Sequence, residues 1–336
     1  MAERRRRGWG GWILALVVVL IVAWIGYWYA AHYAAERALA RVTGGGRPVA
    51  CAATAISGFP LRLDVRCDSP TYSTGPAINA SIGNVRASAP LYQPGTVFAE
   101  IDGPLLVNAP GHNIGLTVTW TSASADASAG LSGITGAGAS FTTFKAENST
   151  PLTKLGLLSI SAESASGAFS PAGGGYRVTG DARHLTLTGP ANALPPIDIS
   201  IDATAEDLGA LGFRPEPVVL AWLHGTPSLT INDLRLAMND AIVGASGKLS
   251  LSKDCKLNGT LLLRYNSVEA LGNLIETLKP GSRDKYAAAL QGIAAMSKPV
   301  DTPDGPALET TVSFLDGLVF LTILPLPINP IPPICL

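Results

Sequence analysis

The chain has 336 residues, of which 24 are Lys or Arg and 25 are Asp or Glu, so charged residues make up 15% against about 25% in an average soluble protein. The hydrophobic share of 47% excludes an intrinsically disordered chain, because such chains bury too little apolar surface to offset the entropy of ordering. The 36 Gly and 25 Pro residues exclude a membrane protein built of many helices and favour short extended segments separated by turns.

The N-terminal segment is predicted to span a membrane. Four arginines at positions 4–7 precede a stretch that contains no Asp, Glu, Lys or Arg before Glu36. As a helix, residues 8–31 would rise about 36 Å, which exceeds the hydrocarbon core of about 30 Å. Aromatic residues flank this stretch, with Trp9 and Trp12 at one end and Tyr27 and Trp28 at the other, as is usual at membrane interfaces. We therefore expect a transmembrane helix at 8–31, followed by a helical linker at 32–46.

The arginine cluster also predicts the orientation of this anchor. Basic residues before a span resist translocation, so residues 1–7 should form a cytoplasmic basic tail and residues 47–336 should lie across the membrane. A cleaved signal peptide, with Ala38-Leu39-Ala40 as its cleavage site, is the alternative, although the apolar stretch is longer than an ordinary signal peptide requires. Both readings export the rest of the chain.

The exported part offers no basic surface to nucleic acids. Without Glu3 and the four N-terminal arginines, it carries 20 basic and 24 acidic residues, a net charge of −4. Nucleic-acid binding needs a basic patch that neutralises phosphates, so we expect no nucleic-acid partner.

Alternation of apolar and polar residues predicts a mainly β domain. The clearest strand is Phe59–Arg66, where the period of two is typical of one buried and one wet face. Softer alternation predicts strands at Thr96–Ile101, Ile114–Trp120, Ala139–Ala146, Leu157–Ala162, Arg177–Thr188, Ile197–Ala203, Ser228–Leu236, Lys248–Leu251, Lys256–Tyr265 and Glu309–Leu324. Since no long helices intervene, we expect long curved antiparallel sheets rather than a doubly wound α/β fold.

Glycines mark the expected turns and one expected loop. Asp102-Gly103, Gly173–Gly175, Asn258-Gly259 and Asp316-Gly317 should supply the positive φ angles of tight turns or bulges. Gly133–Gly138 is interpreted as a small-residue loop, without the lysine that a phosphate-binding loop would need.

Helical patterns are confined to a few places. Asn266 and Glu269 resemble a capping box at the start of one helix, which Pro280 ends. A second helix is expected to begin at Ser282 and to end before Pro299, and a shorter one is expected at Pro217–His224. Each has a single apolar stripe, so these helices should cap an end or a face of the sheet.

The C-terminal segment from Leu318 to Leu336 is apolar but rich in proline. Five prolines between positions 325 and 333 remove amide donors and prevent a regular helix, so a second membrane helix is not expected. We expect a last strand and a tail that packs on the domain; an apolar segment for a partner or for lipid is the alternative.

The exported part contains four cysteines, and none of them forms a C-x-x-C motif. An even number in an oxidising compartment favours disulfides. Cys51 and Cys67 should pair because the chain between them can turn back at Gly58, and Cys255 with Cys335 then follows by elimination. A zinc site is disfavoured, because the four histidines lie far from each cysteine in the sequence.

The sequence contains no convincing catalytic motif. S-x-x-K occurs at Ser250–Lys253 and at Ser282–Lys285, but without the companion motifs of the enzymes that use it. We therefore expect no enzyme, no cofactor and no metal. A buried titratable cluster that included His112, His184 or His224 would point to an enzyme instead.

Several motifs resemble one known family. Cys51 and Cys67 bracket Gly58-Phe59-Pro60-Leu61-Arg62, and A-P-L-Y-Q-P at 89–94 and E-I-D-G-P-L at 100–105 follow, with an apolar, Pro-rich ending at Phe320–Pro333. This combination resembles the family called domain of unknown function 2125. The resemblance implies an envelope protein of Gram-negative bacteria without an established activity, and hence an inner-membrane anchor and a periplasmic main domain.

A weaker resemblance concerns the two segments 245–251 and 257–263. Their cadence of G-x-L-x-L and L-x-G-x-L-x-L is similar to the closing repeats of AsmA-like envelope proteins, whose long curved sheets form an apolar groove for lipid. Any amphipathic hairpin has the same cadence.

We therefore expect an inner-membrane-anchored, periplasmic β-rich protein whose sheet binds or transfers lipid or another apolar ligand. The alternative is an envelope scaffold that binds protein partners through a sheet edge or the Pro-rich tail, with no small-molecule ligand.

Overall fold

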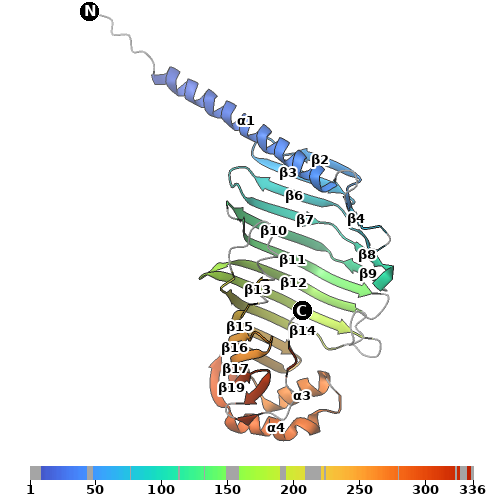
Figure 1. Ribbon diagram of the computed structural model, residues 1–336, viewed down its shortest axis with the longest axis vertical. Helices are drawn as coiled ribbons and strands as arrows, with labels where there is room; N and C mark the ends of the chain where they lie inside the picture. The colour runs from blue at the N-terminus through green and yellow to red at the C-terminus, as the bar shows by residue number, and fades with distance from the viewer. Residues whose placement is uncertain are drawn as a thin grey trace, which may run out of the picture.

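A long helix, a stack of strands and a pair of helices follow one another along the molecule (Figure 1). The computed structural model describes residues 9–43, 48–75, 77–112, 114–131, 133–148, 159–189, 194–208, 221–222, 225–278, 280–321, 324–325 and 331–333. The fold is mainly β with a large antiparallel sheet, preceded by one apolar helix, as the sequence predicts.

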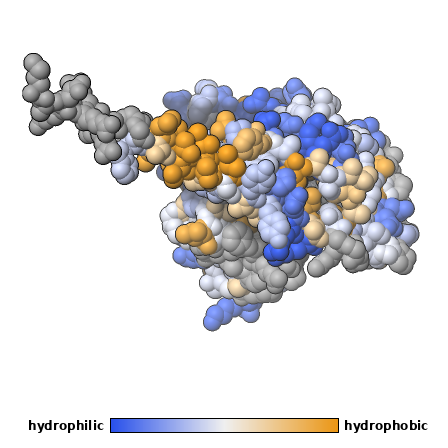
Figure 2. Space-filling model, turned by 90° about the horizontal axis from the view of Figure 1, so that it is seen from above, coloured by the Kyte–Doolittle hydropathy of each residue, from blue (hydrophilic) through white to orange (hydrophobic). Residues whose placement is uncertain are grey.

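Helix α1 (Trp9–Thr43) runs without a break from the predicted span into the predicted linker. It is the one helix in the described residues that is long and apolar enough to cross a membrane. Residues 14–23 are exposed, and Trp24 is the first residue packed against the sheet. Figure 2, seen from above, shows the hydrophobic side chains of α1 as a large orange patch beside a mostly blue and white body. The helix thus suggests a single-pass membrane anchor.

Twenty-one strands join in one sheet within the described residues. In chain order they are β1 (Val49–Ala50), β2 (Ala53–Ser57), β3 (Arg62–Asp68), β4 (Thr71–Ser73), β5 (Asn79–Ser81), β6 (Val85–Pro90), β7 (Thr96–Ile101), β8 (Leu105–Ala109), β9 (Ile114–Thr119), β10 (Ser122–Gly130), β11 (Gly133–Asn148), β12 (Ser159–Ala172), β13 (Gly175–Thr188), β14 (Ile197–Glu206), β15 (Ser228–Met238), β16 (Ala241–Leu251), β17 (Leu257–Tyr265), β18 (Lys298–Thr302), β19 (Gly305–Leu315), β20 (Leu318–Leu321) and β21 (Leu324–Pro325).

The main ladder is an antiparallel meander that forks at its N-terminal end. From β10 to β17 each strand pairs with the next, and β17 pairs with β19. One edge of β11 holds β10 along residues 133–142 and β9 along residues 145–148. Thr143, with a φ of 51°, lies between these two stretches. One branch therefore continues as β10-β7-β6-β3-β2 and the other as β9-β8-β5-β4-β1.

Several strand predictions need correction. Residues 133–138 belong to β11 instead of forming a loop, because their backbone pairs with that of β10. The strand expected at Phe59–Arg66 starts at Arg62, after a turn at residues 59–61. Gly103 does not adopt a positive φ, whereas Gly173, Gly174, Gly259 and Gly317 do. The segment Glu309–Leu324 is divided at the Asp316-Gly317 turn.

The two helices at the C-terminal end, α3 (Val268–Leu278) and α4 (Arg283–Met296), lie where they were expected. The capping prediction was wrong by one residue, because Ser267 Oγ accepts the Ala270 N–H at 3.0 Å. Asn266 instead accepts the Ile242 N–H at 3.1 Å. Of the third predicted helix, Pro217–His224, only residues 221–222 lie within the described part, and they are helical.

Ser282 precedes α4 as expected, but its side chain makes no cap bond. The carboxylate of Glu276 caps the helix instead, because it accepts hydrogen bonds from the backbone N–H groups of Gly281, Ser282 and Arg283. These bonds stabilise the ionised form and lower the pKa of Glu276.

Candidate ligand-binding face

Most apolar side chains of the main ladder lie on one face of the sheet, with Phe98 and Leu262 among the exceptions. Cross-strand partners share a face, so the ladder can be followed as rows that run across the strands. One row passes through thirteen strands from β2 to β19. Its members are Ile56, Val65, Ala87, Ala99, Ala125, Ala139, Gly167, Gly180, Ile201, Leu234, Ala245, Leu263 and Thr310. We call this side the apolar face; Thr310 is the one polar residue in the row.

The row displaced by one residue lies on the opposite side and is polar. Its members are Arg66, Arg86, Glu100, Ser124, Ser140, Ser166, Asp181, Ser200, Arg235, Gly244, Arg264 and Glu309. We call this side the polar face. A shift of one residue along a strand moves a side chain to the opposite face. The register of the strands therefore places most polar side chains on one face and most apolar side chains on the other.

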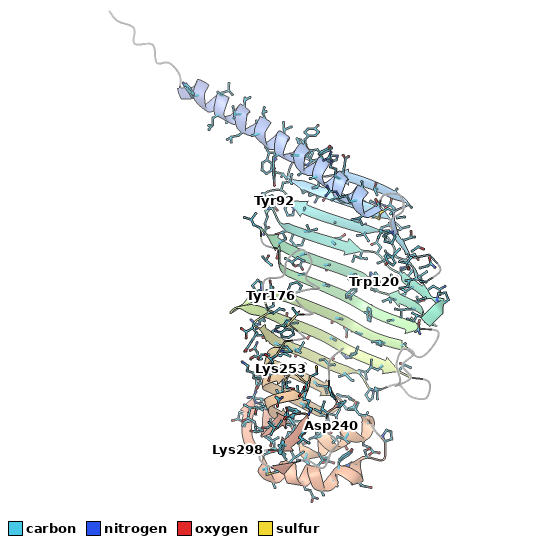
Figure 3. All side chains as sticks on the ribbon, in the orientation of Figure 1. Tyr92, Trp120, Tyr176, Asp240, Lys253 and Lys298 are labelled. Carbon is cyan, nitrogen blue, oxygen red and sulfur yellow. A yellow bond between two sulfur atoms is a disulfide. The ribbon has the colours of Figure 1, made fainter. Side chains whose placement is uncertain are left out.

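Side-chain size changes along the apolar face. Between β6 and β13 the row contains only Ala and Gly, and from β14 onward it includes Ile and Leu. In Figure 3 the side chains over β7 to β12 are correspondingly short. We call the part of the apolar face from β7 to β13 the middle section. It is partly exposed: Val97 on β7 and Val178 on β13, which belong to a second apolar row, are each 41% exposed.

Both ends of the apolar face are covered. At the N-terminal end, Leu63 and Leu91 are buried against Trp28 of α1. Farther along, Tyr176 and Ala205 pack with Leu208 and Trp222. At the C-terminal end, Tyr265 is 1% exposed, and its hydroxyl shares a hydrogen bond of 2.6 Å with Ser297, directly after α4. The exposed apolar section therefore lies between two packed ends.

The polar face carries ion pairs whose charges compensate one another. Arg177 binds Asp202 through two side-chain bonds, which lower the pKa of Asp202 and raise that of Arg177. Lys248, Thr230 and Ser228 all donate to Glu206. The bond from Lys248 is the largest of the effects that lower the Glu206 pKa to about 2. Such groups are stabilised as ions, which is the opposite of what a general acid or base near neutral pH requires.

A cavity of about 610 Å³ lies at the C-terminal end of the polar face. Arg235 and Arg264 line it, but Asp304 binds Arg235 at 2.8 and 3.0 Å, and Glu309 binds Arg264 at 2.8 Å. The two guanidinium groups are thus already compensated, and this cavity has no surplus charge from them to attract an ionic ligand.

The predicted Cys51–Cys67 disulfide is present. Cys51 lies between β1 and β2, which belong to different branches of the fork, so the bond to β3 fastens the point where the chain passes from one branch to the other. Cys255 is disulfide-bonded, but Cys335 lies outside the described residues, so their pairing stays a prediction. The Pro-rich tail is described only at residues 331–333, where the Ile331 N–H donates to the Gly317 carbonyl at 2.8 Å.

The histidines do not form a cluster in the part of the chain that the structure describes. His184 is exposed and pairs with Glu163 at 2.9 Å. The side chain of His112 and the whole of His224 lie outside the described residues. No group of three or more His, Cys, Asp or Glu suited to a metal occurs among the residues searched. Lys253 of the first S-x-x-K segment is exposed in a turn.

An apolar helix long enough to cross a membrane, followed by a forked antiparallel sheet, suggests a single-pass membrane protein with a β-rich domain. Residues 24–332 match the model of a family described as uncharacterised and conserved in bacteria, domain of unknown function 2125 (DUF2125). The chain belongs to this family, as its motifs suggested. No curated protein and no solved structure matches the chain.

Proposed function

We propose that the protein binds the acyl chains of membrane lipids on the middle section of its apolar face. The observation that carries this proposal is the sorting of side chains into apolar and polar rows along the main ladder, together with the partial exposure of the apolar face between β7 and β13, where Val97 and Val178 are each 41% exposed. Continuous exposed apolar surface is costly in water and marks binding sites. The polar face of the same strands provides solubility.

The dimensions of the middle section suit an acyl chain. Five neighbouring strands, β7, β10, β11, β12 and β13, at a spacing of about 4.8 Å give a strip about 19 Å wide. An acyl chain occupies about 15 Å in one leaflet, half of the hydrocarbon core. Ala and Gly side chains leave the floor of this strip low and without hydrogen-bonding groups, as an apolar chain requires.

Lipid is favoured as the occupant because the apolar face begins at the membrane helix. Leu63 and Ile56 pack with Trp24 and Trp28 of α1, and the same row continues from Val65 through Ala99 into the middle section. A membrane that surrounds α1 would therefore adjoin the first strands of the apolar face. We further propose that α1 holds the sheet in the periplasm on the inner membrane, with the N-terminus in the cytoplasm.

A matched pair of charge substitutions tests the proposal. Val178→Glu places a carboxylate on the apolar face, whereas Ser170→Glu places one on the polar face of the adjacent strand, opposite Arg177. Both sites are exposed. The full chain is reconstituted in vesicles that contain a phosphatidylethanolamine with a photoactivatable group in its acyl chain, and crosslinked peptides are identified by mass spectrometry.

We expect crosslinks to β10–β13 in the wild type, a loss of about tenfold in V178E, equivalent to about 1.4 kcal/mol, and little change in S170E. Crosslinks to α1 should persist in all three proteins and serve as the internal control. If β10–β13 remain unlabelled in the wild type while α1 is labelled, lipid binding by the sheet is contradicted, and the scaffold alternative takes its place.

A further inference from the structure

The turn between β2 and β3 exposes apolar side chains beside the membrane helix. Phe59 and Leu61 are 54% and 59% exposed. Gly58 begins the turn with a φ of 103°, and a Cβ there would lie 2.7 Å from the Arg62 carbonyl oxygen. The Arg62 N–H closes the turn on the Gly58 carbonyl at 3.1 Å. The turn thus has a defined shape that presents two apolar side chains to the outside.

Two indole groups fasten this turn to α1. Trp24 Nε1 donates to the Pro60 carbonyl at 2.8 Å, and Trp28 Nε1 donates to the Arg62 carbonyl at 3.2 Å. The ring of Phe59 meets that of Trp28 edge to face, with centroids 5.3 Å apart. The depth of the turn in a membrane is therefore set by the depth of Trp24 and Trp28.

The length of α1 places these tryptophans at the edge of the hydrocarbon. The part of the helix that precedes its contact with the sheet, residues 9–23, rises only about 22 Å. A hydrocarbon core is about 30 Å thick, and tilting the helix would increase the shortfall. The core must therefore extend about five residues farther, to the level of Trp24–Trp28, where the turn lies.

A third exposed side chain adjoins the turn. The Leu91 N–H donates to the Leu61 carbonyl at 3.0 Å, and the next residue, Tyr92, is 71% exposed. In Figure 3, Tyr92 lies at the side of the sheet from which α1 projects. Tyrosine and tryptophan are the side chains that membrane interfaces favour, because one end of each is apolar and the other is polar.

From these contacts we propose that Phe59, Leu61 and Tyr92 form a second membrane contact, seated in the interface of the leaflet that faces the sheet. The partner is a lipid surface. Held by α1 and by this second membrane contact, the sheet has a fixed orientation on the bilayer. The proposal needs α1 as an anchor but does not depend on lipid binding by the apolar face, so the two can fail separately.

The test compares two leucines of equal exposure at opposite ends of the sheet. Leu61 and Leu315 are each 59% exposed, so Leu61→Cys and Leu315→Cys should both fold. The cysteines among the described residues are disulfide-bonded, which allows labelling of the introduced thiol with a fluorophore under non-reducing conditions. Each full-length variant is reconstituted in vesicles of phosphatidylethanolamine and phosphatidylglycerol that contain a headgroup-proximal spin-labelled lipid, and Tyr92→Cys is treated in the same way.

Labels at positions 61 and 92 should be quenched by the spin-labelled lipid and protected from aqueous iodide by about fivefold relative to the label at position 315. The label at position 315 should respond to iodide and not to the lipid quencher. If iodide reaches positions 61 and 92 as readily as position 315, the second membrane contact does not exist, whatever the crosslinking of the apolar face shows.

Discussion

The middle and the C-terminal sections of the sheet share the same alternation of apolar and polar residues, but the apolar residues are packed differently in the two sections. From β14 to β19 the apolar face presents Ile, Leu and Tyr265 to packed side chains, and Ala203, Ala245 and Tyr265 are buried. From β7 to β13 the same face presents mainly Ala, Gly and Val; Val97 and Val178 are exposed there, whereas Ala123 and Tyr176 are buried. One pattern therefore builds a core where other elements cover it and leaves apolar side chains partly exposed where they do not. The difference teaches that side-chain size and cover, rather than the alternation, separate the stabilising part of this sheet from its proposed site.

The largest expected effect comes from truncating the packed section. Tyr265→Ala should lower the free energy of unfolding by about 4 kcal/mol, because it leaves a cavity and removes the bond to Ser297. Val178→Ala in the middle section should cost less than about 1 kcal/mol, because its side chain is already partly in water. Urea midpoints of the full chain in detergent measure both. Equal losses at the two sites would remove the distinction between the sections.

The disulfide that joins the ends of the two branches should rank next. Replacing Cys51 and Cys67 together by Ser removes a cross-link with a sequence separation of 16, which stabilises by about 3 kcal/mol in the chain-entropy model. The double variant should have a lower urea midpoint than the wild type. Its midpoint should match that of the reduced wild type if the disulfide of Cys255 contributes little to stability. An unchanged midpoint would mean that the pairing of β1 with β4 and of β2 with β3 holds the two branches without the bond.

The strain at the membrane-side turn should give a smaller effect. Gly58→Ala forces a side chain into a positive φ and toward the Arg62 carbonyl, at a cost of about 2 kcal/mol. Because the turn is fastened to α1, the loss should appear as faster proteolysis at residues 58–62, with the C-terminal section left intact. Uniform destabilisation of both ends would contradict the view that the ends are packed separately.

The smallest expected effect concerns the polar face. The Glu206 pKa is lowered from 4.5 to about 2, so its interactions stabilise the fold above pH 4.5, and this contribution is lost as the pH falls toward 2. Glu206→Gln should therefore flatten the dependence of the urea midpoint on pH between about 4.5 and 2, while lipid crosslinking at neutral pH stays unchanged. A variant with the wild-type pH profile would show that the carboxylate contributes nothing there.

The sequence predicts the elements with strong hydrophobic contrast and misses those without it. The apolar N-terminal helix, α3, α4 and the strands at Thr96–Ile101 and Ile114–Trp120 have large apolar or aromatic residues, and the structure confirms these elements. Strand β10 was missed because its pattern alternates Ala with Ser and Asp, and alanine and serine differ little in hydropathy. The same weakness made residues 133–138 look like a loop.

The candidate site was only partly predictable for the same reason. Lipid binding could be suggested from composition and from a resemblance, but its place on the sheet depends on the register of thirteen strands, and six residues of its central row are Ala or Gly. The proposed second membrane contact could not be predicted, because nothing in the sequence shows that Trp24 and Trp28 donate hydrogen bonds to the carbonyls of Pro60 and Arg62. A residue-by-residue count of Ala–Ser alternation would have revealed β10 and the part of β12 that follows the predicted strand Leu157–Ala162.

The most direct test of the central claim is a photo-crosslinking scan along β10 in living bacteria. A benzophenone amino acid replaces Ser124, Ala125, Asp126 and Ala127 one at a time in the full chain, and lipid adducts are detected by mass spectrometry. Because these side chains alternate between the two faces, we predict lipid adducts at positions 125 and 127 and none at 124 and 126. Adducts at all four positions or at none would contradict the assignment of the apolar face as a lipid-binding surface.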